Sequence, residues 1–227
     1  MKLTEILKAE FSGFGRYERI LFPLAVITIG ITAFNGSKIA LIAAVCGISY
    51  TILAGKGRVS CYFIGISGTL CYAYLAFKSA FYGNLALYAL YYFPMEIIGI
   101  FKWSRHLKKN SREIEKRSLS NKEIIIYFSC TFVLSCIASL ILHFSGGKTP
   151  LLDGFTLIFS ILGLLLTVKR CIEQWHIWFL VNLLSFIMWL GAYINGSNCL
   201  AIVLMWLVYL VLGVYFLFSW RKEMKNQ

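Results

Sequence analysis

The residues best suited to chemistry lie in the stretch EQWHIWFLVN, from Glu173 to Asn182. On a helix, Trp175, Trp178 and Asn182 take positions i, i+3 and i+7, and Ser185 continues the same stripe. Indole rings stack on flat rings, best on cationic ones, and an amide in an apolar segment needs a hydrogen-bond partner. The stripe therefore predicts a site for a flat heteroaromatic solute. Two other interpretations stay open: Trp175 as a membrane-interface anchor, and Trp178 with Asn182 as contacts between helices.

A second candidate is the carboxyl group of Glu96, which lies inside an apolar run two residues after Pro94. A carboxylate in hydrocarbon is costly and usually faces a cavity or a partner, so we expect Glu96 to meet a polar or cationic solute. The alternative is a protonated carboxyl bonded to a backbone carbonyl that Pro94 leaves free. Five aromatic residues either line the same cavity or simply pack: Tyr88, Tyr91, Tyr92, Trp206 and Tyr209.

The sequence lacks the motifs of common enzymes. It contains no HExxH, no GxSxG, no phosphate-binding loop and no GxGxxG, and its only aspartate, Asp153, stands at the edge of an apolar segment. We therefore expect no catalytic residue and no cofactor. The seven cysteines show no metal-binding spacing, so we expect no metal site and interpret them as small buried hydrophobic residues.

Composition makes lipid the solvent for most of the chain. Of its 227 residues, 59% are hydrophobic, more than a soluble domain of this size can bury. A span needs about 20 apolar residues. The predicted fold is an all-α membrane protein with eight transmembrane helices, at 20–34, 38–54, 59–77, 84–103, 123–145, 151–169, 174–194 and 198–219.

The basic residues predict how these spans are oriented. Of the 22 Lys and Arg residues, only Lys38, Lys78 and Lys148 fall on one side of the predicted membrane, and the rest, including those of the 102–122 connection, fall on the other. The positive-inside rule then places both termini in the cytoplasm. The net charge of +12 is thus an orientation signal, and we expect no nucleic-acid partner.

The chain also repeats itself weakly. Trp103 and Trp220 each end an apolar span, and Tyr92 and Tyr209 precede them at the same spacing. Both tryptophans are interpreted as interface anchors. The pattern predicts a 1+3+1+3 plan with two parallel three-helix repeats, which bind solutes between them. The expected parts are an amphipathic segment and extra span (1–37), repeat one (38–103), a basic loop and linker span (104–145), repeat two (146–220) and a cytoplasmic tail (221–227).

Four stretches resemble the PnuC family of bacterial vitamin transporters, which carry nicotinamide riboside: KGRVSCYFIGI, FYGNLALYALYYFPMEIIGIFKW, LLDGFTLIFSILGLLLTVKRCIEQWHIWFLVN and the span ending FLFSW. The resemblance covers roughly residues 38–220. It implies a 3+1+3 core related to SWEET sugar carriers, sometimes with an extra N-terminal span, assembled as a homotrimer in the bacterial cytoplasmic membrane. It also implies facilitated uptake, with cytoplasmic phosphorylation trapping the vitamin. The substrate-binding tryptophan and asparagine of the family match Trp178 and Asn182.

The chain departs from the family pattern in its first repeat. Many relatives carry Asn or Gln where this chain has Cys61, Gly68, Tyr88 and Glu96, which leaves fewer amides to hold a ribose. Thiamine, another flat cation associated with some branches of the family, is therefore the second candidate substrate. A non-transporting membrane scaffold is the remote alternative, and it predicts no saturable uptake.

Overall fold

The computed structural model describes residues 38–78, 82–109, 111–146, 149–196 and 200–225, with residues 15, 19, 20, 23, 25, 27 and 30 before them. Apart from three isolated bridges, the regular elements in these ranges are helices. They are α3 (Lys38–Gly55), α4 (Ser60–Lys78), α5 (Tyr82–Leu87), the π-helix η1 (Tyr88–Tyr92), α6 (Phe93–Ser104), α7 (Asn121–Phe144), α8 (Pro150–Val168), α9 (Gln174–Ile194) and α10 (Leu200–Lys225).

The helices confirm an all-α membrane protein. Six helical stretches are long and apolar enough to cross a membrane, one of them the run Leu85–Ser104 through α5, η1 and α6, and Leu41–Gly55 is a shorter apolar helix. Most of the expected first span, 20–34, lies outside the described residues, so the count of eight stays a prediction.

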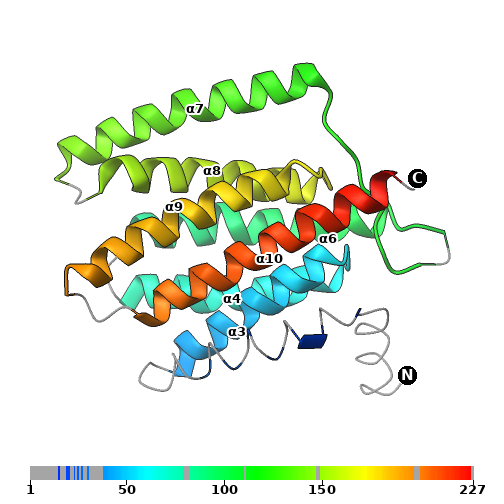
Figure 1. Cartoon of the computed structure of the whole chain (residues 1–227), viewed down its shortest axis with the longest axis horizontal. Helices are drawn as coiled ribbons and strands as arrows, with labels where there is room; N and C mark the ends of the chain where they lie inside the picture. Colours follow the sequence, from blue (N-terminus) through cyan, green and yellow to red (C-terminus); the bar gives the residue numbers. More distant parts are fainter. Residues whose placement is uncertain are drawn as a thin grey trace.

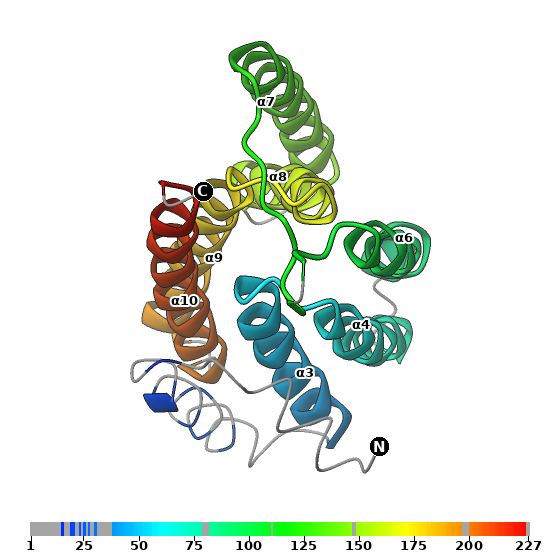
Figure 2. The ribbon, with the colours of Figure 1, turned by 90° about the vertical axis from the view of Figure 1, so that its right-hand side faces the viewer.

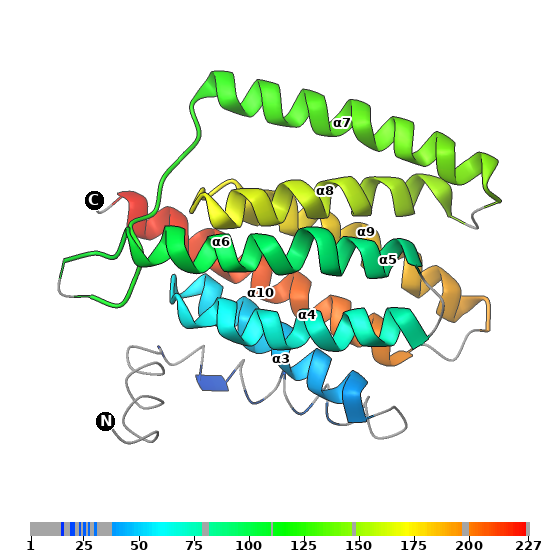
Figure 3. The same cartoon turned by 180° about the vertical axis from the view of Figure 1, so that it is seen from behind.

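Six helices form a closed ring. Each helix contacts the next in the order α3, α4, α6, α8, α9, α10, and α10 contacts α3 again. The end view in Figure 2 shows this order. Three of these helices fall in each of the two predicted repeats. The side views in Figures 1 and 3 show the helices running side by side along one axis. This ring is compatible with the parallel repeats, which remain a prediction.

Helix α7, the expected linker span, lies outside the ring against α8 (Figures 1 and 2). The two helices approach closely because Gly154 of α8 faces Ser139 of α7, where an added Cβ would lie 2.4 Å from the Ser139 hydroxyl oxygen. That hydroxyl is satisfied within its own helix, because it donates to the carbonyl oxygen of Ser135. Small residues of this kind are typical of helix contacts in membranes.

The basic connection is a structured segment that crosses one end of the ring (Figure 2). We call its described residues, 105–109 and 111–120, the strap, and the end it crosses the basic end. The strap pairs with the α3–α4 turn through the Ile114 N–H and the Gly57 carbonyl oxygen, 3.0 Å apart. It pairs with the α8–α9 turn through the Arg117 N–H and the Arg170 carbonyl oxygen, also 3.0 Å apart. Both turns take a left-handed residue, at Gly57 and Arg170.

Buried side chains fasten the strap to the ring. Lys116 places its ammonium group 2.5 Å from Glu223 Oε2 of α10 and 4.6 Å from the centre of the Trp220 ring. Burial lowers the pKa of Lys116, and the contact with Glu223 opposes that shift. Glu173 accepts hydrogen bonds from the Ser118 hydroxyl (2.6 Å) and the Leu119 N–H (3.1 Å). The strap thus closes the basic end of the ring.

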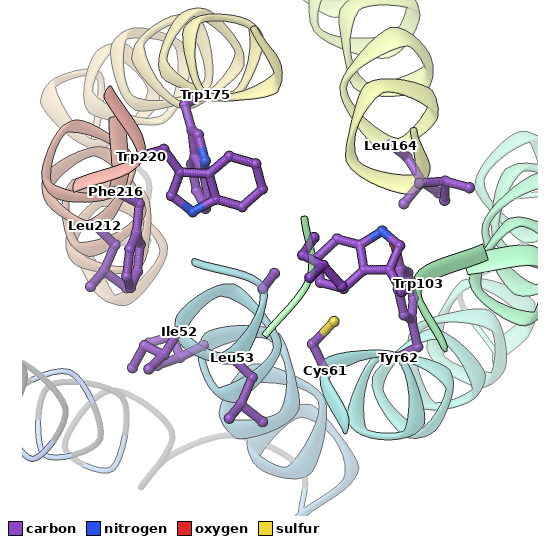
Figure 4. Close-up of a cluster of buried hydrophobic side chains, with 14 of the residues drawn as sticks. Ile52, Leu53, Cys61, Tyr62, Trp103, Leu164, Trp175, Leu212, Phe216 and Trp220 are labelled. Atoms are coloured by element: carbon purple, nitrogen blue, oxygen red, sulfur yellow. The ribbon is translucent and has the colours of Figure 1, made fainter. Parts of the chain in front are cut away.

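Trp103 and Trp220 lie in the core rather than at a lipid interface. Both side chains are fully buried, and Figure 4 shows Trp220 beside Trp175 and Trp103 beside Tyr62. The Trp103 indole N–H donates to the Thr167 carbonyl oxygen (3.0 Å). The interpretation of both tryptophans as interface anchors was therefore wrong. Their indole N–H groups bond protein carbonyls instead.

Candidate functional site

A cavity of about 270 Å³ lies inside the ring, and all six ring helices contribute to its wall. Seven of the eight predicted site residues line it: Glu96, Tyr88, Tyr92, Trp175, Trp178, Asn182 and Tyr209. The eighth, Ser185, is buried on α9 but is not among the described lining residues, so its role stays a prediction. Residues that the sequence analysis singled out on separate helices thus line one cavity.

One wall of the cavity presents indoles and amides from α9. The Trp178 indole N–H donates to the Thr167 hydroxyl oxygen, 3.1 Å away, which fixes the ring plane. Gly163 of α8 makes room for that ring, because an added Cβ would lie 3.0 Å from it. The Asn182 amide donates to the Tyr209 carbonyl oxygen, 3.1 Å away. Trp178 and Asn182 therefore hold neighbouring helices and line the cavity at the same time.

Trp175 lies one turn closer to the basic end than Trp178. Its ring centre is 5.3 Å from that of Phe216 and 5.7 Å from that of Trp220, and only 3% of the residue is exposed. A residue so enclosed is not an anchor at the membrane surface. It forms the floor of the cavity at the basic end.

The opposite wall presents hydroxyl groups and one carboxyl group. Glu96 of α6 is 4% exposed, and its Oε1 accepts a hydrogen bond from the Thr69 hydroxyl of α4, 3.0 Å away. Gly65 is needed beside it, since an added Cβ would lie 2.8 Å from Glu96 Oε1 and 2.8 Å from the Tyr50 ring. In the structure the carboxyl group thus bonds a side chain, Thr69, rather than the carbonyl near Pro94 that the alternative interpretation invoked.

The π-helix η1 brings two predicted tyrosines to the cavity. The Phe93 N–H bonds the carbonyl oxygen of Tyr88, five residues back, so the turn before Pro94 is widened. Tyr88 stacks on Tyr72 with ring centres 5.5 Å apart and planes 16° apart, and it also contacts Tyr92. The sequence predicted one apolar span, 84–103, over this segment. Proline explains the widening, because it lacks the N–H of a regular ladder.

Five residues that line the cavity each bury one polar atom that has no hydrogen-bond partner among the described residues. These atoms are Tyr50 Oη, Glu96 Oε2, Gln174 Nε2, Trp175 Nε1 and Trp206 Nε1. Buried polar groups are nearly always paired, and an unpaired one is costly, so each needs a specific explanation. These unpaired groups are concentrated in the residues that line one cavity.

Sequence reasoning missed several residues of this wall. Tyr50, Thr69, Tyr72 and Gln174 all line the cavity. A signal for Gln174 was present, since it stands four residues before Trp178 and shares the helical face of Trp178 and Asn182. Thr69 gave a weaker signal, because hydroxyl side chains are common inside membrane helices. Tyr91, a further candidate, instead donates its hydroxyl to the Ile161 carbonyl oxygen (2.6 Å).

Comparisons with known proteins give one family for this chain. A family model described as nicotinamide mononucleotide transporter matches residues 37–222. The nicotinamide riboside transporter PnuC of Neisseria mucosa is 31% identical over 95% of this chain and 85% of its own length. The protein of the same name from Haemophilus influenzae is 30% identical over 100% of this chain and 99% of its own.

The fold matches a solved structure as well. The crystal structure of the vitamin B3 transporter PnuC aligns with a TM-score of 0.82 and 29% identity, covering 100% of this chain and 99% of that one. Sequence and fold therefore give the same assignment over nearly the whole length. The chain belongs to the PnuC family of membrane transporters.

Proposed function

We propose that this chain carries nicotinamide riboside across the membrane. The observation that supports it most is the two-sided cavity inside the ring, with indoles and amides on one wall and hydroxyls and a carboxyl group on the other. The riboside joins a flat, cationic pyridinium ring to a sugar bearing hydroxyl groups. The ring suits stacking on Trp178, and the carboxyl group of Glu96 suits a cation or hydroxyl donors.

The cavity favours the riboside over the mononucleotide that the family model names. A phosphate group is held in proteins by Arg, Lys or helix N-termini. The described residues that line this cavity include no Lys or Arg, and the only charged group among them is the carboxyl of Glu96. A phosphate dianion would lose its hydration there and face a carboxyl group, so the phosphorylated form is disfavoured.

The lack of Lys and Arg in the cavity lining also supports trapping of the substrate by phosphorylation. A substrate phosphorylated in the cytoplasm no longer fits the cavity, so phosphorylation traps it inside the cell. Glu96 is the sole carboxyl group among the described lining residues, and a proton relay needs a chain of such groups. Passage is therefore facilitated diffusion. The basic end of the ring faces the cytoplasm of a bacterial inner membrane, and the positive-inside rule predicts both termini on that side.

We also propose a homotrimer, on the resemblance to the family. Helix α7 stands outside the ring and exposes large apolar side chains such as Ile125, Phe132 and Leu140, which suit contact with lipid or with another protomer. The mass of the detergent-solubilised protein, measured by native mass spectrometry, tests this point. A monomeric mass at concentrations near those of the membrane would refute it.

The test of the proposed function is a titration of tryptophan fluorescence in the purified protein. Nicotinamide riboside, nicotinamide mononucleotide and thiamine are added in parallel, because Trp175, Trp178 and Trp206 line the cavity and report its occupancy. We expect saturable quenching by the riboside and none by the mononucleotide. Quenching by thiamine alone would make thiamine the substrate. No quenching by any of the three ligands would favour a non-transporting scaffold.

Uptake of radiolabelled riboside into proteoliposomes then separates binding from transport. Facilitated passage predicts saturable uptake without an ion gradient, and uptake that stops when inside and outside concentrations are equal. Addition of a riboside kinase with ATP inside the vesicles is expected to raise the final amount taken up. An absolute requirement for a proton gradient would contradict the facilitated mechanism.

A further inference from the structure

The strap covers the outer side of the cavity floor. Trp175, which forms that floor, packs against Phe216 and Trp220, and Figure 4 shows Trp220 beside it. Ile114 of the strap is fully buried and belongs to the same hydrophobic cluster. The Lys116 ammonium group lies over the Trp220 ring, 4.6 Å from its centre. A solute that leaves the cavity at the basic end therefore meets the floor first and the strap behind it.

This exit is closed in the structure. Protein interiors are packed as densely as organic crystals, so a riboside passes such a floor only if the packed side chains are displaced. The strap is bonded to the α3–α4 turn of the first predicted repeat and to the α8–α9 turn of the second. Because the strap bridges the two turns, it has to leave one of them when the basic end opens.

The strap is bound firmly on the side of α9 and α10. Backbone bonds run in both directions at Arg117, whose N–H donates to the Arg170 carbonyl oxygen (3.0 Å) and whose carbonyl oxygen accepts from the Ile172 N–H (2.9 Å). The carboxylate of Glu173 accepts hydrogen bonds from the next strap residues, 118–119. The buried ammonium group of Lys116 adds its contact with α10. Hydrogen bonds to charged groups are the strong ones, so this side is expected to stay together.

The strap meets the α3–α4 turn through looser contacts. The Ile114 N–H donates to the Gly57 carbonyl oxygen, 3.0 Å away. The ion pair between Arg58 Nη2 and Glu113 Oε1 spans 3.9 Å, which is beyond hydrogen-bond range, and the Glu113 side chain is 30% exposed. A partly exposed ion pair of this length contributes little to stability. The described contacts therefore make the α3–α4 turn the side from which the strap separates at lower cost.

We propose that the strap is the gate of the basic end: it stays on α9 and α10 and separates from the α3–α4 turn when the cavity opens toward the cytoplasm. Gly57 suits a contact that opens and closes, because it has no side chain to interlock with Ile114. An added Cβ there would lie 2.9 Å from Ile114 Cγ1. This inference rests on the proposed function.

The experiment locks each side of the strap with a disulfide. Arg58 and Glu113 are opposed in an antiparallel bridge, where Cα atoms are about 4.5–5.5 Å apart, a spacing that a disulfide spans. Arg58→Cys with Glu113→Cys, in a parent whose seven native cysteines are replaced by alanine, joins the strap to the α3–α4 turn. Arg117 and Cys171 are opposed in a parallel bridge, so Arg117→Cys in a parent that keeps Cys171 joins the strap to the α8–α9 turn.

Uptake of radiolabelled riboside into proteoliposomes is then measured before and after oxidation. We expect the cross-link of Arg58→Cys with Glu113→Cys to reduce uptake in proportion to the fraction cross-linked, and dithiothreitol to restore it. The matched cross-link of Arg117→Cys with Cys171 should leave uptake unchanged. Quenching of tryptophan fluorescence by the riboside should persist in both proteins, because the cavity is intact and can still be entered from the other end of the ring.

The outcomes separate the inference from the function on which it rests. Full uptake by the protein cross-linked at the α3–α4 turn would overturn the gate while leaving riboside transport standing. Equal loss of uptake with both cross-links, or loss of quenching together with uptake, would overturn it too. Failure of either pair to cross-link would contradict the described contacts of the strap and count against the gate. A wild-type protein without uptake would overturn the proposed function and this inference together.

Discussion

Trp220 donates its indole N–H to the carbonyl oxygen of Gly55, 2.6 Å away, although 165 residues separate them in the chain. The bond joins α10 to the end of α3. Trp103, at the end of α6, makes the corresponding bond to Thr167 near the end of α8. Each bond links the last helix of one predicted repeat to the first helix of the other. Together they close the ring at the basic end, on the floor side of the cavity.

The first prediction concerns these two bonds. Trp220→Phe keeps an aromatic ring but leaves the Gly55 carbonyl without its donor, which costs about 1–3 kcal/mol for a buried acceptor. We expect a lower Tm for the purified protein in detergent, and a similar decrease for Trp103→Phe. Phe218→Leu is the control on the same helix, because Phe218 is 63% exposed, and it should leave the Tm unchanged. A wild-type Tm in Trp220→Phe would contradict the role of the bond.

The second prediction concerns the charge of the cavity. Glu96→Gln keeps an oxygen to accept from Thr69 but removes the carboxylate. We expect the variant to weaken the binding of nicotinamide riboside about tenfold more than the binding of dihydronicotinamide riboside, whose ring is uncharged. The reason is that interactions with charged groups are stronger than those between neutral groups. Isothermal titration with both ligands measures the difference. Equal losses would limit Glu96 to a structural role.

The helical spans after residue 37 were predictable from the sequence, because a membrane requires long apolar stretches and turn residues mark their ends. The expected span at 174–194 coincides with α9, Gln174–Ile194. The functional stripe on α9 was predictable too, since Trp178 and Asn182 share one face of a helix whatever surrounds it.

Features that depend on contacts between distant segments were not predictable. Trp220 follows the pattern of an interface anchor, and only its distant partner Gly55 shows that it is buried. The sequence of the strap predicts a basic loop, yet Ile114 inside it is fully buried, and its N–H donates to the Gly57 carbonyl oxygen. Tyr50 and Thr69 resemble ordinary residues of membrane helices until the ring places them beside Glu96.

The third prediction concerns the predicted stacking face. Trp178→Ala removes the ring on which the substrate stacks, and we expect riboside affinity to fall about tenfold or more. Asn182→Leu loses the bond to the Tyr209 carbonyl oxygen and is expected to weaken binding as well. Size-exclusion chromatography checks that both variants stay folded. Unchanged affinity in both would remove this face from the binding site.

The last prediction uses Cys171 as a reporter of the strap. This cysteine is fully buried, its position pairs with Arg117 of the strap, and burial raises the pKa of its thiol to about 11. Thiolate is the reactive form, so a protein that keeps only Cys171 should react slowly with a water-soluble maleimide at neutral pH. Because the pKa is raised, the thiolate fraction and the rate should increase about tenfold for each pH unit below that value.

The strap should control that rate. Glu173→Ala removes the acceptor of Ser118 and Leu119, so the strap is held less firmly over Cys171, and we expect faster labelling at the same pH. Lys222→Ala is a matched control, because its side chain stands at the same end of the ring outside the strap contacts described above, and it should leave the rate unchanged. Labelling of the parent protein as fast as that of the unfolded protein would show that the strap does not cover Cys171 in solution.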